Sequence, residues 1–351
     1  MKKFSYHLSI FIFIFIIINI IAAILWEPIK GSKLSNINNK KYYSNEVLDA
    51  IGLESDEQYH FYNEMWTARK FRYVQFAEHL EAETKNQKYV NVSQEYGRKV
   101  ENNIDCNIRI FFYGASQVFG YNVKDNQTIP AYFKKIIDNK FKDKNYCVYN
   151  FGSASYHSTQ ENILFLNHFL KQKILPNDYA IFIDGRTEKG NDKSRIHDQI
   201  KLIFNGLDLK VWGELKFSSL IFINSLPAVK LYKNLQKKFS YKSKNKEIEN
   251  DILDHEKTNE VERVFKSNLV IRNAICENIS INCYTFLHPL HPEDGIINKK
   301  RYNLFRNLGQ LIDISKIFDG NESLNFIDAG HYSPRGSNLI AEVIFANIDF
   351  R

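Results

Sequence analysis

The sequence lacks the motifs that mark several large functional classes. Its four cysteines and ten histidines show no zinc-site spacing, and the chain has no Walker phosphate loop and no RNA-binding motif. It also lacks internal repeats, and 15 glycines and seven prolines in 351 residues exclude a fibrous or low-complexity protein. The chain is 44% hydrophobic and 14% aromatic, which is ample for one large α/β domain with appendages.

The excess of positive charge does not indicate a nucleic-acid partner. The net charge of +7 comes from lysines scattered along the chain. The densest group, between Lys237 and Lys246, lies in a polar stretch typical of a solvated loop. We therefore expect no binding to nucleic acid.

One long hydrophobic run stands at the start of the chain. It extends from Leu8 to Trp26 and follows two lysines. About 20 apolar residues span a bilayer, and the lysines favour a cytoplasmic N-terminus. A cleaved signal peptide is the alternative, but the run is longer than the usual hydrophobic region of about 7–15 residues, and no A-x-A site follows. We expect a single-pass anchor over residues 1–27, in contact with the membrane through residues 7–26, and an extracytoplasmic domain on the periplasmic or external side.

Residues 28–104 are predicted to form a polar stalk and an N-terminal extension. The extension contains an amphipathic pattern that includes Tyr62, Trp66 and Phe71, which favours one helix. A short extended segment follows around Tyr89–Val92. We expect this extension to pack on the main domain.

The main domain is predicted to extend from residue 105 to residue 351. Strand-like runs alternate with amphipathic helical segments, which favours a three-layer α/β/α fold with a doubly wound, flavodoxin-like parallel sheet. The last helix is expected to begin after Ser333 as N-cap, with Pro334 at its first position. Residues 190–265 fit the pattern least and are interpreted as a helical insertion near the rim of the site. The expected strands are IRIFFYG, YCVYNFG, DYAIFIDG and INCYTFLHP.

The four cysteines form two candidate pairs. Cys276 and Cys283 lie between a helical segment and the next strand, while Cys106 and Cys147 precede two strands expected to be neighbours. An exported domain permits both disulfides. Free buried thiols fit the residues equally well.

Polar side chains follow the ends of the expected strands, where ligands bind in doubly wound folds. The first strand leads into Gly114-Ala115-Ser116, and the second ends at Gly152. Near the C-terminus, Asp328 precedes His331 by three residues. Hydroxyl, imidazole and carboxylate are the groups that a nucleophilic serine needs for activation. The pattern therefore predicts a catalytic serine site.

These motifs resemble the SGNH (GDSL-like) hydrolase superfamily over residues 105–350. Gly114-Ala115-Ser116 matches the family's first block, G-D-S, with Ala115 in place of aspartate, and the D-x-x-H block matches Asp328-Ala329-Gly330-His331. The run GASQVFGYNVKDNQTIPAYF is the form found in membrane-anchored bacterial members. The nucleophile elbow of ordinary α/β-hydrolases is excluded, because Val118 stands where that motif needs glycine.

The resemblance implies roles for these residues. Ser116 would attack an ester carbonyl, His331 would act as general base, and Asp328 would orient His331. The backbone N–H groups of Ser116 and Gly152 would stabilise the oxyanion. No metal or cofactor is implied.

One block of the family is altered. Its G-x-N-D falls on Gly185-Arg186-Thr187-Glu188, so Thr187 stands where the oxyanion-hole asparagine belongs. The hydroxyl of Thr187 or the amide of Asn191, just downstream, would have to replace it. Arg186 could hold an anionic substrate or form a surface salt bridge.

A second pair of polar residues stands in the segment FLHPLHP. His288 and His291 have the look of a metal pair, but the neighbouring prolines favour a structured loop.

The resemblance implies a membrane-anchored serine esterase or O-acyltransferase. Its substrates would be acyl esters, mainly acetyl esters, of cell-envelope or surface carbohydrate. A non-catalytic glycan-binding or assembly component is the alternative favoured by the lost asparagine. A lipase or thioesterase is disfavoured, because residues 237–262 are charged where an apolar lid would be expected.

Overall fold

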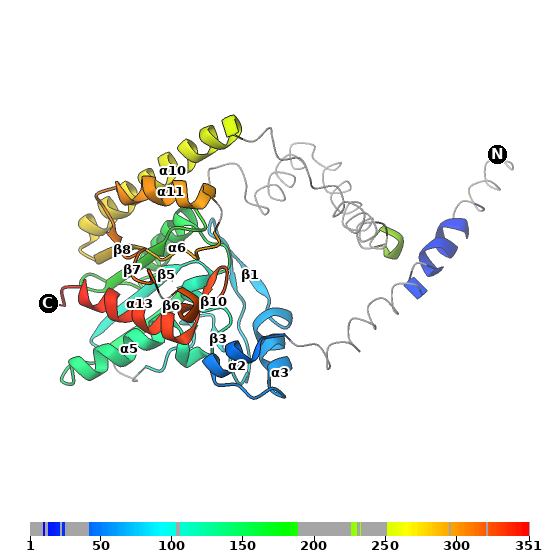
Figure 1. Cartoon of the computed structure of the whole chain (residues 1–351), viewed down its shortest axis with the longest axis horizontal. Helices are drawn as coiled ribbons and strands as arrows, with labels where there is room; N and C mark the ends of the chain where they lie inside the picture. Colours follow the sequence, from blue (N-terminus) through cyan, green and yellow to red (C-terminus); the bar gives the residue numbers. More distant parts are fainter. Residues whose placement is uncertain are drawn as a thin grey trace. The chain divides into compact units, whose positions relative to one another are not determined.

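The computed structural model describes residues 10, 13–21, 23–24, 42–102, 106–188, 226–229, 232, 251–294, 296–320 and 322–350. The chain divides into one unit of residues 1–40 and 193–251 and a second unit of residues 41–192 and 252–351. The second unit contains the fold described below (Figure 1). Asn191 lies outside the described residues, as does most of the expected anchor.

No helix within the described ranges is both long enough and apolar enough to cross a membrane. Most of the expected helical insertion, residues 190–265, also lies outside these ranges. Its last residues, from Asp251 onward, belong to one long helix.

A seven-stranded sheet forms the centre of the second unit, in the order β3-β4-β6-β5-β7-β8-β9. Every neighbouring pair from β4 to β9 is parallel, which confirms the predicted parallel core. The antiparallel edge pair β3–β4 comes from the N-terminal extension and was not predicted. The strands are β3 Val92–Ser93, β4 Gly97–Arg98, β5 Ile108–Gly114, β6 Tyr146–Gly152, β7 Tyr179–Asp184, β8 Asn282–Leu287 and β9 Ile312–Asp313.

Helices cover both faces of the sheet, as the alternation of strands and helices predicts (Figure 1). Successive side chains of a strand point to opposite faces. Accordingly, Ile110 and Phe112 of β5 belong to one core cluster and Phe111 and Tyr113 to the other. The first cluster is covered by α5 Ile129–Lys140 and α13 Pro334–Ala346, and the second by α6 Ser158–Leu170 and α10 Asp251–Ile279.

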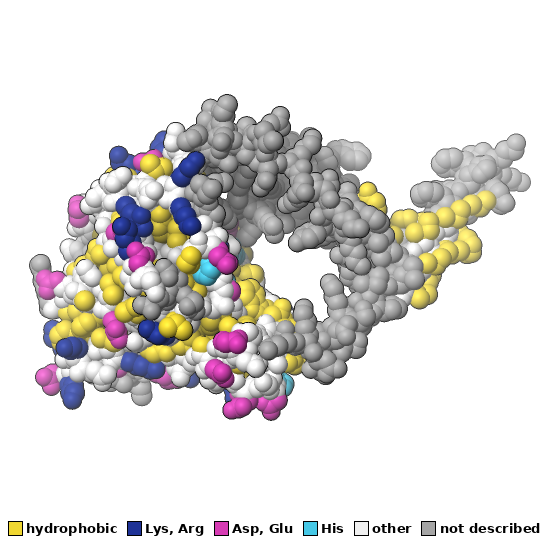
Figure 2. Space-filling model, viewed as in Figure 1, with side chains coloured by type: hydrophobic (Ala, Val, Ile, Leu, Met, Phe, Trp, Pro, Cys, Tyr) yellow, Lys and Arg dark blue, Asp and Glu magenta, His cyan; other side chains and the backbone are white. Residues whose placement is uncertain are grey.

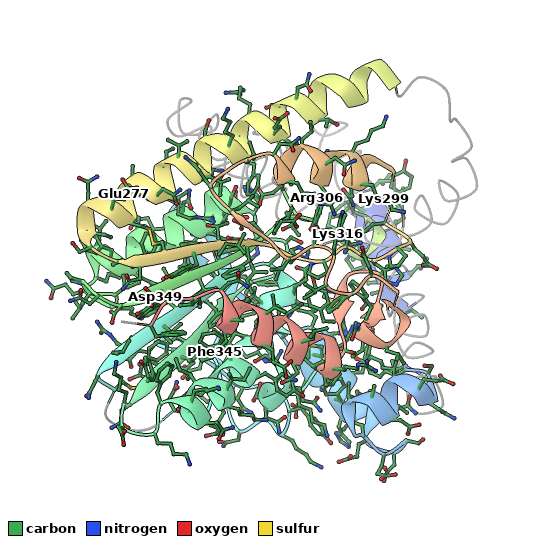
Figure 3. The ribbon with its side chains drawn as sticks, turned by 60° about the vertical axis from the view of Figure 1, so that its left-hand side comes forward. Glu277, Lys299, Arg306, Lys316, Phe345 and Asp349 are labelled. Carbon is green, nitrogen blue, oxygen red and sulfur yellow. A yellow bond between two sulfur atoms is a disulfide. The ribbon has the colours of Figure 1, made fainter. Side chains whose placement is uncertain are left out.

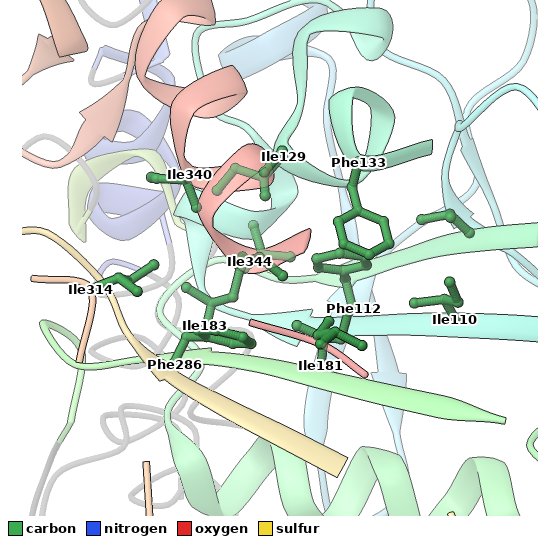
Figure 4. Close-up of a cluster of buried hydrophobic side chains, with 14 of the residues drawn as sticks. Ile110, Phe112, Ile129, Phe133, Ile181, Ile183, Phe286, Ile314, Ile340 and Ile344 are labelled. Carbon is green, nitrogen blue, oxygen red and sulfur yellow. The ribbon is translucent and has the colours of Figure 1, made fainter. Parts of the chain in front are cut away.

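The cluster under α5 and α13 consists mainly of isoleucine side chains, with phenylalanines among them (Figure 4). Phe133 of α5 meets Phe112 of β5 edge to face, with ring centroids 5.1 Å apart. Helix α13 begins as predicted, because Ser333 Oγ accepts a hydrogen bond from the Gly336 N–H at 3.1 Å and Pro334 follows it.

Arg306 holds the end of helix α11 Ile296–Arg306, because it donates to Ser315 Oγ at 2.7 Å (Figure 3). Positively and negatively charged side chains are interspersed on the face shown in Figure 2.

Both candidate cysteine pairs, Cys106–Cys147 and Cys276–Cys283, are disulfides. The alternative of free thiols is therefore wrong.

The extension does not form one long helix through Phe71. The helical part consists of α3 Gln58–Tyr62 and a π-helical turn, η1, over Asn63–Thr67. Phe71 instead begins strand β1 Phe71–Val74, which pairs with β2 Glu78–Glu81. Aromatic and β-branched residues in this run favour a strand, and pairing with β2 outweighs the helical spacing of the apolar residues.

The extension packs on the segment that follows Ser116. Phe61, Met65 and Val90 form one buried cluster with Phe119 and Tyr121. Helix α2 Asn45–Ile51 adds Leu48 and Ile51 to that cluster.

Candidate active site

Ser116 lies at the tight exit of the central strand. Strand β5 ends at Gly114, and the short helix α4 Ser116–Phe119 begins almost at once. A Cβ on Gly114 would lie 2.3 Å from Val118 Cγ2, so the turn has no room for a side chain there. Gly120 ends α4 in the left-handed region, at φ 85°, which glycine adopts most readily. The two glycines around Ser116 thus make a turn that places its hydroxyl beyond the carboxyl end of β5.

The structure brings the three residues of the predicted triad together. Strands β10 Phe326–Asp328 and β11 His331–Tyr332 form a short hairpin before α13. His331 Nε2 lies 3.0 Å from Ser116 Oγ, although the two residues are 215 positions apart in sequence. On the other side of the ring, His331 Nδ1 lies 2.8 Å from Asp328 Oδ2.

Hydrogen bonds keep Asp328 ionised. Burial raises the pKa of this carboxyl, but hydrogen bonds from the His331 ring and from the backbone N–H groups of Gly330 and His331 outweigh it. The pKa therefore lies below its ordinary value. An ionised Asp328 holds the proton on His331 Nδ1 and leaves Nε2 free to accept the Ser116 proton.

Three residues at this site were missed by the sequence reasoning. The Tyr121 ring lies 5.2 Å from the His331 ring at an interplanar angle of 14°, and the Trp66 ring meets it edge-on at 6.2 Å. Asn122 Nδ2 donates to Asp328 Oδ2 at 2.7 Å. The one available signal was that Tyr121 and Asn122 directly follow Gly120 in the first block.

Gly152 has a different role from the predicted one. Its backbone N–H, expected as an oxyanion donor, donates to Asn150 Oδ1 at 3.0 Å. A Cβ on Gly152 would lie 2.2 Å from the backbone nitrogen of Phe119 and 2.7 Å from the carbonyl carbon of Val118. Gly152 therefore lets the end of β6 pack directly against the backbone of α4.

The altered third block is fixed by its last residue. Glu188 is buried and accepts hydrogen bonds from the Ser158 N–H at 3.0 Å and from Ser158 Oγ at 2.6 Å. Arg186 pairs with Asp294 at 2.9 Å, which is the salt bridge that the sequence left open. Thr187 is half-buried in this loop, three residues after the end of β7. Strand β7 pairs with β5, the strand that leads to Ser116.

A buried charge network lies behind the loop. Arg272 contacts Asp184 at 2.6 Å and Glu161 at 3.4 Å, and all three side chains are almost fully buried. Burial, together with the nearby charge of Asp184, raises the pKa of Glu188 to about 8. The same causes raise the pKa of Glu161 well above its ordinary value. Glu161 and Glu188 therefore keep their protons to a higher pH than an exposed glutamate does.

His288 anchors the loop that carries His331. Its Nδ1 lies 2.6 Å from the Tyr332 hydroxyl, and its Nε2 accepts from the Arg186 N–H at 3.3 Å. Burial lowers the pKa of His288 to about 4, so the ring is neutral. His291 Nδ1 accepts from the Glu293 N–H. No group of three or more histidine, cysteine or acidic residues within the described ranges is arranged to hold a metal ion.

A cavity of about 570 Å³ lies along β3, β4 and the start of β6, and none of the three triad residues lines it. The triad instead lies at the carboxyl end of β5.

No protein-family model and no curated protein matches the chain. Solved structures similar to it include the lipase Lip_vut3 from a goat rumen metagenome, with 14% identity and a TM-score of 0.44 over 68% of this chain and 97% of that one. The acetylxylan esterase Axe2 from Geobacillus stearothermophilus has 12% identity and a TM-score of 0.39 over 71% and 97%. A member of the lipolytic G-D-S-L family from Veillonella parvula has 12% identity and a TM-score of 0.37 over 69% and 100%.

Proposed function

We propose that the protein is a serine-dependent hydrolase of carboxylic esters. The observation that carries this proposal is the continuous hydrogen-bonded arrangement of Ser116, His331 and Asp328, with distances of 3.0 and 2.8 Å. A serine hydroxyl with a base within 3.2 Å, and an acid that orients that base, forms an activated nucleophile.

The proposed reaction proceeds in two halves. Ser116 Oγ bonds to the ester carbonyl carbon while its proton moves to His331 Nε2, and Asp328 stabilises the resulting imidazolium. The carbon–oxygen bond to the leaving alcohol then breaks, and His331 returns the proton to that alcohol. In the second half, an incoming hydroxyl gives its proton to His331 and its oxygen bonds to the acyl carbon. The bond from that carbon to Ser116 Oγ then breaks, and His331 returns the proton to Ser116 Oγ.

Two groups are proposed to stabilise the oxyanion. The N–H of Ser116 is at the first position of α4 and has no acceptor within the helix. The hydroxyl of Thr187 is the second donor, in place of the asparagine of the SGNH pattern. Each such donor contributes about 10²–10³ in rate in serine hydrolases.

The proposed substrates are acyl esters, mainly acetyl esters, of cell-envelope or surface carbohydrate. An extracytoplasmic, membrane-anchored location is supported by the hydrophobic run from Leu8 to Trp26. The two disulfides also support it, because such bonds persist in oxidising compartments. Water as the acceptor would make the protein an esterase, and a sugar hydroxyl would make it an O-acyltransferase.

The first test compares the full-length protein in detergent with its Ser116→Ala variant on p-nitrophenyl acetate and on an acetylated polysaccharide. We expect the variant to lose at least about 10³-fold in kcat/KM. Ser267→Ala, which removes an exposed hydroxyl from α10, is the matched control and should leave turnover unchanged. Equal turnover by Ser116→Ala would contradict the proposal.

The second test identifies the acceptor. A burst of p-nitrophenol followed by slow turnover, accelerated by an added oligosaccharide that becomes acetylated, supports transfer. Steady hydrolysis that added sugar leaves unchanged supports an esterase.

A further inference from the structure

Asp328 has a second side-chain partner besides His331. Its Oδ1 accepts from the backbone N–H groups of Gly330 and His331, at 2.7 and 2.9 Å. Its Oδ2 accepts from Asn122 Nδ2 at 2.7 Å, on the same oxygen that His331 Nδ1 approaches at 2.8 Å. Both carboxylate oxygens are therefore held, and the direction from Asp328 to His331 depends in part on Asn122.

Asn122 is itself fixed by its backbone and by burial. It has a φ of 63°, in the left-handed region where asparagine is enriched among non-glycine residues. Its side chain is almost fully buried, and it follows Ser116 by six residues in the segment that α4 begins. One short segment thus carries both the nucleophile and a hydrogen-bond donor to Asp328.

The N-terminal extension determines which way the Asn122 amide faces. Trp66 Nε1 donates to Asn122 Oδ1 at 2.8 Å, and the Tyr43 hydroxyl donates to the same oxygen at 3.1 Å. An indole N–H can only donate, so it fixes this atom as the amide oxygen. Burial raises the pKa of Tyr43, which keeps its hydroxyl protonated as a second donor. The amide nitrogen must then point at Asp328.

Arg98, also from the extension, holds the backbone around this segment. It is fully buried and donates to the carbonyls of Phe119 at 2.7 Å and Val123 at 2.6 Å. Its Nε pairs with Asp125 at 2.9 Å. The ends of the segment that contains Asn122 are thereby tied to strand β4.

We infer that Asn122 is a positioning residue for Asp328 and that the extension, through Trp66 and Tyr43, completes the catalytic site. The inference rests on the proposed function, since it assigns Asn122 to the same triad. It also means that residues 105–351 do not contain the whole active unit.

The first experiment measures pH profiles of full-length Asn122→Gly. Glycine keeps the left-handed backbone and removes only the side chain. We expect kcat to fall by roughly 10- to 100-fold, the range for a lost hydrogen bond to a charged group, with KM changed less than about threefold. Without this donor, the Asp328 carboxylate stabilises the His331 imidazolium more strongly. The acid limb of kcat/KM should therefore move to higher pH.

A matched control is available in the extension. Asn86 is also in the left-handed region, at φ 52°, but is exposed. Asn86→Gly should leave kcat and the pH profile unchanged. A loss of thermal stability in Asn122→Gly with an unmoved acid limb and an unchanged kcat would overturn the inference and leave Asn122 a purely structural residue.

A second variant keeps the test sharp if Asn122→Gly folds poorly. Trp66→Phe retains an aromatic ring beside His331 and removes the Nε1 donor, so the Asn122 amide loses its stronger restraint. Relative to the wild type, we expect a lower kcat and a shift of the acid limb of kcat/KM to higher pH. Both effects should be smaller than in Asn122→Gly. Wild-type values for this variant would contradict the role given to the extension.

A readout without substrate separates this inference from the proposed function. The His331 titration can be followed by NMR in histidine-labelled protein and assigned by its loss in His331→Gln. An upward shift of the His331 pKa in Asn122→Gly supports the positioning role even if the wild type cleaves no ester, which would refute the proposed function alone. If the wild type cleaves esters but the His331 titration is unshifted in Asn122→Gly, the inference alone is refuted.

Discussion

The Tyr121 ring lies nearly parallel to the His331 imidazole, with centroids 5.2 Å apart and planes 14° apart. Its other neighbours are aromatic and cationic: the Trp66 ring lies 4.9 Å away, and the Arg69 guanidinium carbon lies 4.0 Å from the Tyr121 centroid. The buried Tyr121 hydroxyl has no hydrogen-bond partner within the described part of the chain. Tyr121 therefore acts on His331 through its ring face.

This relationship predicts opposite outcomes for two substitutions. Tyr121→Phe keeps the stacked ring and removes a buried, unpartnered hydroxyl, so activity should stay within about twofold and stability should stay equal or rise by up to about 1 kcal/mol. Tyr121→Leu removes the flat surface that restrains the imidazole, so kcat should fall several-fold. Steady-state kinetics and thermal unfolding of both variants check this. Equal activity in the leucine variant would show that Asp328 alone orients His331.

The contact between Asp328 and His331 predicts the effect of removing one charge. Asp328→Asn keeps the size of the side chain but replaces an acceptor with an amide, which favours the wrong tautomer of His331. In serine hydrolases this change lowers kcat by about 10⁴-fold. We expect a loss of that order at neutral pH with a nearly normal KM. A loss below about tenfold would contradict the orienting role of Asp328.

The packing of Gly152 predicts a stability effect. The Cβ of Gly152→Ala would lie 2.2 Å from the Phe119 nitrogen, and backbone cannot yield as a flexible side-chain end can. We expect a loss of more than the roughly 1–3 kcal/mol typical of overpacking, together with reduced activity as α4 is displaced. Urea unfolding measures the first effect. Gly309→Ala is the control, because a Cβ there has no atom within 4 Å. Wild-type stability in Gly152→Ala would refute the packing role.

Local patterns were enough to predict the centre of the fold. The strands β5 to β8 are apolar runs bounded by turn residues, and the N-cap at Ser333 is a short-range signal. Ser116, Asp328 and His331 were predicted because two short blocks resemble motifs of the SGNH hydrolases. These features depend on few neighbours in sequence, so one sequence reveals them.

The missed features depend on contacts between distant segments. The partners Asn122 and Asp328 are 206 residues apart, and Trp66 reaches Asn122 across 56 residues. No local pattern distinguishes an asparagine that binds a carboxylate from one that ends a turn. Phe71 was assigned to a helix for a related reason: its strand is stabilised by pairing with β2, which helical periodicity does not reveal.

The buried carboxyl of Glu188 predicts how stability changes with pH. Its pKa is raised from an ordinary value of 4.5 to about 8, first by burial and then by the charge of Asp184. Between these two values the folded protein binds a proton that the unfolded chain does not. The stabilisation of the folded state that Glu188 contributes is therefore complete below about pH 4.5 and is lost as the pH rises through 8.

Glu188→Gln should weaken this dependence, because the amide does not titrate. Between pH 5 and about pH 8 the unfolding temperature of the variant should fall less than that of the wild type, and above pH 8 the difference between the two should stay constant. The bond to Ser158 survives, since the amide oxygen still accepts its N–H. Glu277→Gln on the exposed face of α10 (Figure 3) is the control and should follow the wild-type curve. Parallel curves for Glu188→Gln and the wild type would mean that Glu188 is ionised in the folded protein, with Arg272 neutralising it at a distance.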